Sequence, residues 1–421
     1  MSTYRQPGTV VTEHLFDVPL RHDDPEGETI SLFAREVGAA DGVERPWLLF
    51  LQGGPGFASP RPVGRDAWLD RALRDYRVLL LDQRGTGRST RVNRHSLLRR
   101  GGAEAQAEYL SHFRADSIVR DAELVRRRLL GDVPWSVLGQ SFGGFCAVTY
   151  LSFAPHGLRE VLIAGGLPGL SASAEDVYRA TYPHVAAKNV AHYARYPGDV
   201  ETVRAIVAHL LEHDVRLPGG ARLTAPAFQT LGRALGGLSG SHELHYLTED
   251  AFDAPGVLGD AFLEEVQHRL SLAAAPLYAV LHESIYAQGP GATAWAAHRL
   301  RPAAFDNYAS GPVLLTGEMM YPWQFDLDPA LIPLRDAAEL IAARPSWPVL
   351  YDPAVLAANE VPVAAAVYHD DMYVDRTLSL RTAAAIRGTR VWVTNEHEHD
   401  GMRVSAGAVL DRLIAIARGD A

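Results

Sequence analysis

The sequence predicts an α/β protein, in which a mostly parallel central sheet is interrupted by a mainly helical insert. Short apolar, β-rich runs alternate with helical patterns in the first part of the chain, which is typical of a parallel sheet built from strand–helix units. Strand signals fade between residues 167 and 344, where long segments become helical. They return near the C-terminus, so we expect one domain that is interrupted by another.

The expected strands begin with segments 10–18 and 29–35, which are predicted to pair antiparallel. The remaining expected strands are 47–51, 77–81, 135–138, 160–164, 361–368 and 389–394. Helices are expected at 175–195, 199–212, 258–275 and 405–417. The chain is therefore divided into a sheet domain, residues 1–166 and 345–421, and a helical cap domain, residues 167–344 (the insert).

The composition is that of a globular protein. Hydrophobic residues make up 47% of the 421 residues and charged residues 21%. The net charge of -10 and the pI near 5.9 argue against nucleic acid or an anionic membrane as a partner. The sequence shows no apolar run of signal-peptide length and nothing close to the roughly 18 apolar residues that span a bilayer. We therefore expect a cytoplasmic location.

The most informative motif follows the strand expected at 135–138. The sequence GQSFGG places Ser141 between glycines, and a helical pattern comes after it. A strand, G-x-S-x-G and a helix form the nucleophile elbow, a sharp turn that holds the serine oxygen clear of the backbone. Glycines permit this turn and the close packing of the next helix. The motif predicts a serine nucleophile in an α/β-hydrolase fold, and a chance glycine-rich turn is the alternative.

A second glycine loop, QGGPG, follows the strand expected at 47–51. In this fold such a loop supplies one backbone donor to the oxyanion hole, and the residue after the nucleophile supplies the other. We expect the backbone N–H groups at Gly54 and Phe142 to bind the oxygen that becomes negative in the tetrahedral intermediate. An ordinary turn is again the alternative.

A serine hydroxyl needs a base to remove its proton, and in this fold the acid and the histidine follow the serine in that order. Asp371 is preferred to Asp370 because it lies one residue further beyond its strand. His399 is preferred to His397 because the H-D-G turn that it opens can project the ring toward the sheet. A metal site at these histidines is a weaker interpretation, since no second ligand cluster is placed to complete it.

Two other features receive structural interpretations. The segment DQRGTGRS resembles a phosphate-binding loop but lacks the G-K-[ST] ending and has the wrong spacing for a dinucleotide. Asp82 and Arg84 are therefore expected to brace the loops around the active site. Cys146, the single cysteine, can form neither an intrachain disulfide nor a multi-cysteine zinc site, and it is interpreted as a buried core residue.

Taken in order, GGPG, DQRGTGRS, GQSFGG and the C-terminal EHDG resemble the motifs of the proline iminopeptidases (prolyl aminopeptidases), in their larger branch. These are serine peptidases of the α/β-hydrolase fold. The resemblance implies removal of an N-terminal residue, preferentially proline, from peptides with a free N-terminus. It also implies Ser141, Asp371 and His399 as the triad, and no metal or organic cofactor. One departure is Gln52, which stands where the family usually has histidine and is expected to alter either the packing of the loop or the hydrogen bonds behind the oxyanion hole.

An aminopeptidase must also bind a charged N-terminus, which calls for carboxylates in the cap domain. Glu283 and Glu318 are the candidates, because each stands among apolar and aromatic residues, where a carboxylate needs a cationic partner. A salt bridge or a helix-capping role is the alternative for each. Aromatic residues that could line a proline-sized pocket, or simply belong to the core, are Phe57, Phe142, Tyr286, Tyr321 and Trp323.

Two other functions are compatible with these motifs. An esterase or amidase acting on small acyl compounds would use the same triad and be indifferent to a free amine. A non-catalytic ligand-binding protein would keep the fold without an activated serine, and the intact order of serine, aspartate and histidine argues against it. Epoxide hydrolases and dehalogenases are disfavoured because they use an aspartate where this chain has Ser141.

Overall fold

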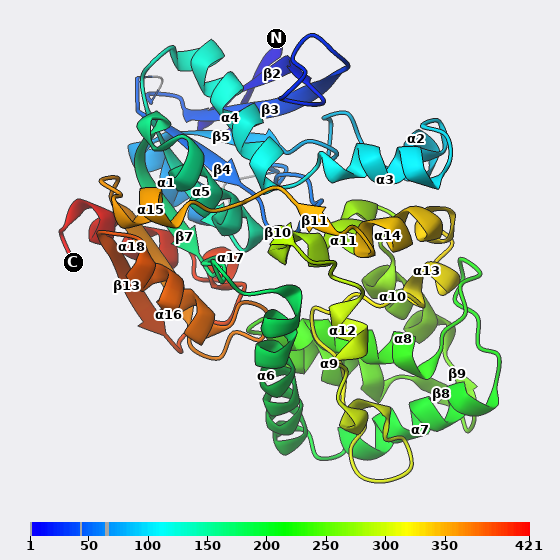
Figure 1. Ribbon diagram of the computed structural model, residues 1–421. Helices are drawn as coiled ribbons and strands as arrows, with labels where there is room; N and C mark the ends of the chain where they lie inside the picture. The colour runs from blue at the N-terminus through cyan, green and yellow to red at the C-terminus, as the bar shows by residue number, and fades with distance from the viewer. Residues whose placement is uncertain (1, 43, 64–66) are drawn as a thin grey trace.

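The structure is a computed structural model that describes residues 2–42, 44–63 and 67–421. Its centre is a nine-stranded sheet with strand order β1-β2-β3-β5-β4-β6-β7-β12-β13 (Figure 1). The strands are β1 (Ser2–Gln6), β2 (Thr9–Pro19), β3 (Thr29–Ala39), β4 (Trp47–Leu51), β5 (Arg77–Asp82), β6 (Trp135–Gln140), β7 (Leu158–Ala164), β12 (Val363–Tyr368) and β13 (Thr389–Thr394).

The predicted sheet is confirmed, with one strand added. β2 and β3 pair antiparallel from Thr9↔Ala39 to Pro19↔Thr29, and β3 joins β5 in the same sense. The pairs from β5 through β13 are parallel. The sequence did not predict β1, because this edge strand is polar and largely exposed, without the apolar alternation that identifies strands.

Helices cover both faces of the sheet, and successive residues of β4 point to the two faces in turn. Leu49 and Leu51 pack with α4 (Ala115–Leu130) and α5 (Phe142–Phe153). Leu48 and Phe50 pack on the other side with α1 (Ala67–Asp75) and α18 (Ala408–Arg418). This alternation follows from the two-residue period of a strand. The remaining described helices outside the insert are α2 (Arg94–Leu98), α3 (Ala103–Ser111), α15 (Pro353–Ala357), α16 (Arg376–Ala385) and α17 (Gly401–Val404).

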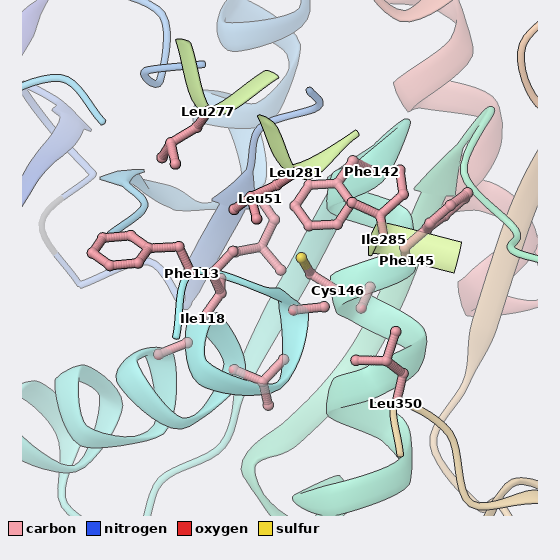
Figure 2. Packing of buried hydrophobic residues seen from close by; sticks show 14 of the residues in the cluster. Leu51, Phe113, Ile118, Phe142, Phe145, Cys146, Leu277, Leu281, Ile285 and Leu350 are labelled. Atoms are coloured by element: carbon pink, nitrogen blue, oxygen red, sulfur yellow. The ribbon is translucent and has the colours of Figure 1, made fainter. Parts of the chain in front are cut away.

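The core beneath the elbow is densely apolar. Figure 2 shows Cys146 of α5 among the buried side chains of this cluster, which include Leu51, Ile118 and Leu281. Cys146 is fully buried, and burial raises the pKa of its thiol well above the ordinary value. The thiolate that would make this cysteine reactive is therefore disfavoured.

The insert is mainly helical, as expected, and Figure 1 shows its green and yellow helices gathered to one side of the sheet. Its helices are α6 (Ala174–Arg195), α7 (Asp199–Glu212), α8 (Ala225–Gln229), α9 (Gly240–Glu249), α10 (Asp260–Leu270), α11 (Pro276–Leu281), α12 (Ala296–Arg299), α13 (Gln324–Leu327) and α14 (Arg335–Ala342), with the 3-10 turns η2 (Thr230–Gly236), η3 (Glu283–Tyr286), η4 (Ala303–Asp306) and η5 (Ile332–Leu334). The helix predicted at 258–275 is shorter than expected. Helix α10 ends at Leu270, and the remaining predicted residues, 271–275, contain a turn before Pro276.

The insert contributes to two cores. A cluster of its own includes Tyr178, Val207 and Phe262. Leu277 and Ile341, from α11 and α14, belong instead to the cluster on the sheet. The boundaries of the two domains, at 166/167 and 344/345, stay a prediction. In the ranges that the structure describes, no helix combines the length and the apolarity needed to cross a membrane.

Candidate active site

Ser141 lies at the turn between β6 and α5. Its backbone has φ 54° and ψ -125°, a conformation that side-chain-bearing residues rarely adopt and that concentrates at functional sites. The turn fits only because its neighbours lack side chains. A Cβ on Gly143 would lie 1.9 Å from the carbonyl oxygen of Leu51, and one on Gly144 would lie 2.4 Å from that of Gly166. The packing of strand, turn and helix thus imposes the conformation of Ser141.

The glycine loop after β4 lies against the elbow. A Cβ on Gly53 would come within 3.0 Å of the Cβ of Ser141, so the loop backbone passes directly beside the serine. Gly54 has φ +133°, which favours glycine. The carbonyl of Gln52 accepts a hydrogen bond from Nε2 of Gln83 at 3.0 Å, which ties the loop to the end of β5. Phe142 begins α5 and is buried.

Asp371 and His399 are brought together by the loops that follow β12 and β13. Nδ1 of His399 lies 2.7 Å from Oδ2 of Asp371, and both side chains are buried. Oδ1 of Asp371 accepts the backbone N–H groups of Tyr373 at 2.8 Å and Val374 at 3.1 Å. The imidazole packs edge-on against Tyr373, with ring centroids 4.7 Å apart. These contacts fix the carboxylate and the ring relative to each other.

The two rival residues lie elsewhere. Asp370 is exposed and pairs with its neighbour His369 at 2.8 Å. His397 packs edge-on against Trp392, with ring centroids 6.2 Å apart. The hydrogen bond inside the buried pair therefore joins Asp371 to His399 and involves neither rival.

The electrostatic environment favours a proton on His399. Burial alone would lower the pKa of the imidazole. The charge and the hydrogen bond of Asp371 outweigh burial, with a smaller contribution from the charge of Glu318, and raise the pKa above its ordinary value. A carboxylate in this position stabilises the imidazolium, which is the form that a general base takes after it accepts a proton.

A cavity of about 620 Å³ lies over Ser141 and His399. The sheet side of its wall includes the glycine loop and Phe57, and the insert contributes most of the other side. Residues from the insert that line it include Thr230, Arg233, Gly236, Glu243, Glu265, Arg269, Tyr278 and Glu318. The cavity is therefore lined by both carboxylates and cations as well as by the serine.

Glu318 is one of these carboxylates. Its Oε1 accepts a hydrogen bond from the hydroxyl of Tyr278 at 2.8 Å. Within the described part of the chain, its carboxylate makes this hydrogen bond and no ion pair. The guanidinium of Arg233 lies 5.5 Å from the ring centroid of Tyr278, on the same wall. Glu318 thus keeps a second oxygen for a cationic group that enters the cavity.

Glu283 is placed differently from what its sequence context suggested. It does not line the cavity over Ser141. Its two carboxylate oxygens accept the backbone N–H groups of Ala296 and Ala297, each at 2.9 Å, at the start of α12. Burial raises the pKa of this carboxyl to about 7, against the lowering effect of those hydrogen bonds. The contacts correspond to the helix-capping alternative rather than to a binding site for the substrate amine.

Glu283→Ala is expected to destabilise the protein by about 2–4 kcal/mol, because two buried backbone donors lose their acceptors. Urea unfolding followed by tryptophan fluorescence measures this loss. An unfolding midpoint equal to that of the unmodified protein would show that the two N–H groups find other partners.

The sequence did not indicate a role at the site for three residues that lie around it. Tyr278 lies in an apolar segment that indicates only a buried helix, and Arg233 lies in a glycine-rich turn without a motif. Tyr373 stands two positions after Asp371, and this spacing is its only signal. Each acquires its place from the way the insert packs over the sheet.

Asp82 and Arg84 make bracing contacts of the kind expected. Asp82 accepts two hydrogen bonds from Arg61, both at 2.8 Å, just outside the glycine loop. Arg84 is buried and pairs with Asp121 through contacts of 2.7 and 2.6 Å. These side chains hold neighbouring loops in place, and neither belongs to the cavity lining.

Comparisons with known proteins show the fold and the family of this chain. A family model described as the alpha/beta hydrolase fold matches residues 46–236, so the fold that the elbow predicted is confirmed. A proline iminopeptidase of Aeromonas sobria is 50% identical over 412 residues, which covers 96% of each chain. A proline iminopeptidase of Aspergillus aculeatus is 38% identical over 426 residues, which covers 97% of this chain and 94% of that one.

Proposed function

This chain belongs to the proline iminopeptidase family of the α/β hydrolases, and we propose that it is a serine aminopeptidase that releases the N-terminal residue, preferentially proline, from peptides. The observation that carries the proposal is the buried pair of His399 and Asp371, together with a cavity that His399, Ser141 and Glu318 all line. The peptide enters as an extended chain with a free amino end.

In the first half of the reaction, His399 takes the proton of Ser141 as the serine oxygen attacks the first peptide carbonyl. Asp371 holds the imidazole in the tautomer that leaves Nε2 free and stabilises the imidazolium. The backbone N–H groups at Gly54 and Phe142 bind the oxyanion. His399 then gives its proton to the leaving amine, the peptide bond breaks, and an acyl-enzyme remains on Ser141.

In the second half, water replaces the departed amine. His399 removes a proton from the water molecule as it attacks the ester carbonyl, and the same backbone donors bind the second oxyanion. The proton on His399 passes to the oxygen of Ser141 when the ester breaks. The released product is the free amino acid, and the enzyme returns to its starting state.

Recognition of the free amine is assigned to Glu318. Removing a protonated amine from water into this cavity would cost little free energy if the amine paired with a carboxylate there. Tyr278 holds Glu318 by a hydrogen bond and also packs against Phe57, with ring centroids 5.3 Å apart. This aromatic pair gives a pyrrolidine ring an apolar surface next to the carboxylate. A blocked amino end would leave Glu318 without a partner.

The pH dependence follows from the role of His399. Only the neutral imidazole can act as base, so kcat/KM is expected to fall as the pH drops through the raised pKa of His399. Asp371→Asn removes the main cause of that raised pKa. The acid limb should therefore move to lower pH, and kcat should fall by about 10⁴-fold. Asp370→Asn is the matched control, and its profile should coincide with that of the unmodified enzyme. An unchanged profile in Asp371→Asn would contradict the assignment of the acid.

An esterase or amidase for small acyl compounds is the second candidate function, because it would need the same triad. The two are separated by steady-state rates on prolyl-naphthylamide and on a nitrophenyl ester. The aminopeptidase proposal expects ready hydrolysis of the prolyl amide, whose stable bond demands that the leaving amine be protonated. Hydrolysis of the ester alone would leave the triad in place and refute the peptidase assignment.

A further inference from the structure

Three consecutive residues around His399 bind the insert. The carboxylate of Glu398 pairs with Nζ of Lys188 on α6. The backbone N–H of His399 donates to the carbonyl of Gly236 at 3.1 Å. Oδ1 of Asp400 accepts the backbone N–H of Leu238 at 3.0 Å. Two separate parts of the insert, α6 and the segment 236–238, therefore converge on one short loop of the sheet domain.

This loop also has hydrogen bonds of its own, from the backbone N–H of Gly401 to the carbonyl of Glu398 at 2.9 Å and from that of Arg403 to the carbonyl of Asp400 at 2.8 Å. It lies between the end of β13 and the start of α17, outside the sheet and the helices. The backbone N–H of His399 bonds across to the insert rather than to another residue of its own loop. Lys188 is the single lysine in the whole sequence, and its side chain is only 14% exposed in the ion pair. A partly buried pair is screened less by solvent than one at the surface.

The loop of Asp371 also forms hydrogen bonds with the insert. Nε2 of His184, also on α6, lies 2.9 Å from Oδ2 of Asp375. The hydroxyl of Tyr373 donates to the carbonyl of Arg233 in η2. Helix α6 thus contacts both loops whose side chains form the buried pair, at positions one turn apart on the helix.

We propose that the insert positions the general base, with Lys188 acting through Glu398 to hold His399 against Asp371 and Ser141. Lys188 is thereby a positioning residue. The inference rests on the proposed function, since it requires His399 to be the base. The physical reason is that a misplacement of a catalytic group by about 1 Å can cost roughly 100-fold in rate. The insert therefore serves every acyl substrate, including those that make no use of Glu318.

The charges near Glu398 strengthen this assignment. Burial raises the pKa of its carboxyl, Lys188 opposes that effect, and the negative charges of Asp371 and Asp370 add to it. Without Lys188, a half-buried carboxylate would lose its ion-pair partner while the negative charges of Asp371 and Asp370 still acted on it. Repulsion would then displace the loop that carries His399.

The test compares Lys188→Met with Arg179→Met. Arg179 lies on the same helix and pairs with Glu175 at 2.7 Å, away from the loop, so its variant removes an ion pair without touching His399. The readouts are kcat and KM for prolyl-naphthylamide and for nitrophenyl acetate, together with the rate at which a fluorophosphonate labels Ser141. Thermal melting of each variant verifies that it is folded.

Lys188→Met is expected to lower kcat on both substrates by about 10- to 100-fold and to slow labelling by a similar factor, with KM within about twofold. Lys188→Arg should restore most of the rate, because it keeps the charge. Arg179→Met should match the unmodified enzyme. Glu398→Gln, which keeps the size of the side chain, gives a second test by the same readouts if Lys188→Met does not fold.

Equal kcat and labelling rates in Lys188→Met and Arg179→Met would overturn the inference. So would a rise in KM for the prolyl amide alone, since Lys188 would then act on substrate binding. A failure of the unmodified enzyme to react with the fluorophosphonate is a different result. It would refute the proposed serine mechanism, and this inference with it.

Discussion

Ser141→Ala is expected to lower kcat for prolyl-naphthylamide by about a million-fold, the scale seen when a triad serine is removed. The substitution deletes the one oxygen that can attack the carbonyl. It keeps the Cβ, so the elbow and its strained φ of 54° remain as they are. The variant should melt at the temperature of the unmodified enzyme and should still bind peptides. Steady-state rates on the amide and on a nitrophenyl ester measure the loss.

Ser152→Ala is the matched control for this prediction. Ser152 is a buried serine on the same helix, α5, and its hydroxyl donates to the carbonyl of Val148 at 3.1 Å. Its loss removes one hydrogen bond far from the cavity lining. We expect kcat within about twofold of the unmodified value, since one ordinary hydrogen bond contributes only about 1 kcal/mol to stability. Full activity in Ser141→Ala would refute the assignment of the nucleophile.

Glu318→Gln is expected to lower kcat/KM for prolyl-naphthylamide by about 100-fold or more, because breaking a desolvated charge pair costs about 2–5 kcal/mol. Glutamine keeps an oxygen that can accept the hydrogen bond from Tyr278, so the wall of the cavity should be preserved. The nitrophenyl ester has no ammonium group, and its hydrolysis should change little. The ratio of the two rates therefore isolates recognition of the amine.

Glu283→Gln provides the comparison for Glu318→Gln. Glu283 is also a buried carboxylate in the insert, but its oxygens bind the start of α12 rather than facing the cavity. Its variant should keep the preference for a free amine even if stability falls. Equal losses of kcat/KM on the ester and the amide in Glu318→Gln would show that this residue supports the structure of the site and does not bind the N-terminal amine.

The sequence predicts those parts of the site that depend on a short segment of chain or on the order of the strands. The elbow around Ser141 needs glycines at fixed positions, and a Cβ on Gly143 would overlap the carbonyl of Leu51. The acid and the histidine follow consecutive parallel strands, whose carboxyl ends meet at one edge of the sheet. That is why the sequence alone indicates Asp371 and His399 as the acid and the base, whose side chains lie 2.7 Å apart in the structure.

The parts that depend on packing between distant segments could not be predicted. Glu283 and Glu318 stand in similar apolar surroundings, and only the fold shows that one caps α12 and the other lines the cavity. Arg233 and Gly236 lie in a turn without a motif, although the carbonyl of Gly236 holds the backbone of His399. No local pattern encodes these contacts. The Glu283 contacts join residues 13 and 14 positions apart, and the contact between Gly236 and His399 joins residues more than a hundred positions apart.

The most direct test of the central claim compares prolyl-naphthylamide with its N-acetylated form on the unmodified enzyme. Acetylation removes the charge of the amine and leaves the scissile bond unchanged. The account predicts that kcat/KM for the free amine exceeds that for the blocked one by about 100-fold or more, the factor that a buried charge pair supplies. Equal values for the two substrates, or a preference for the acetylated one, would contradict the assignment of this chain as an aminopeptidase.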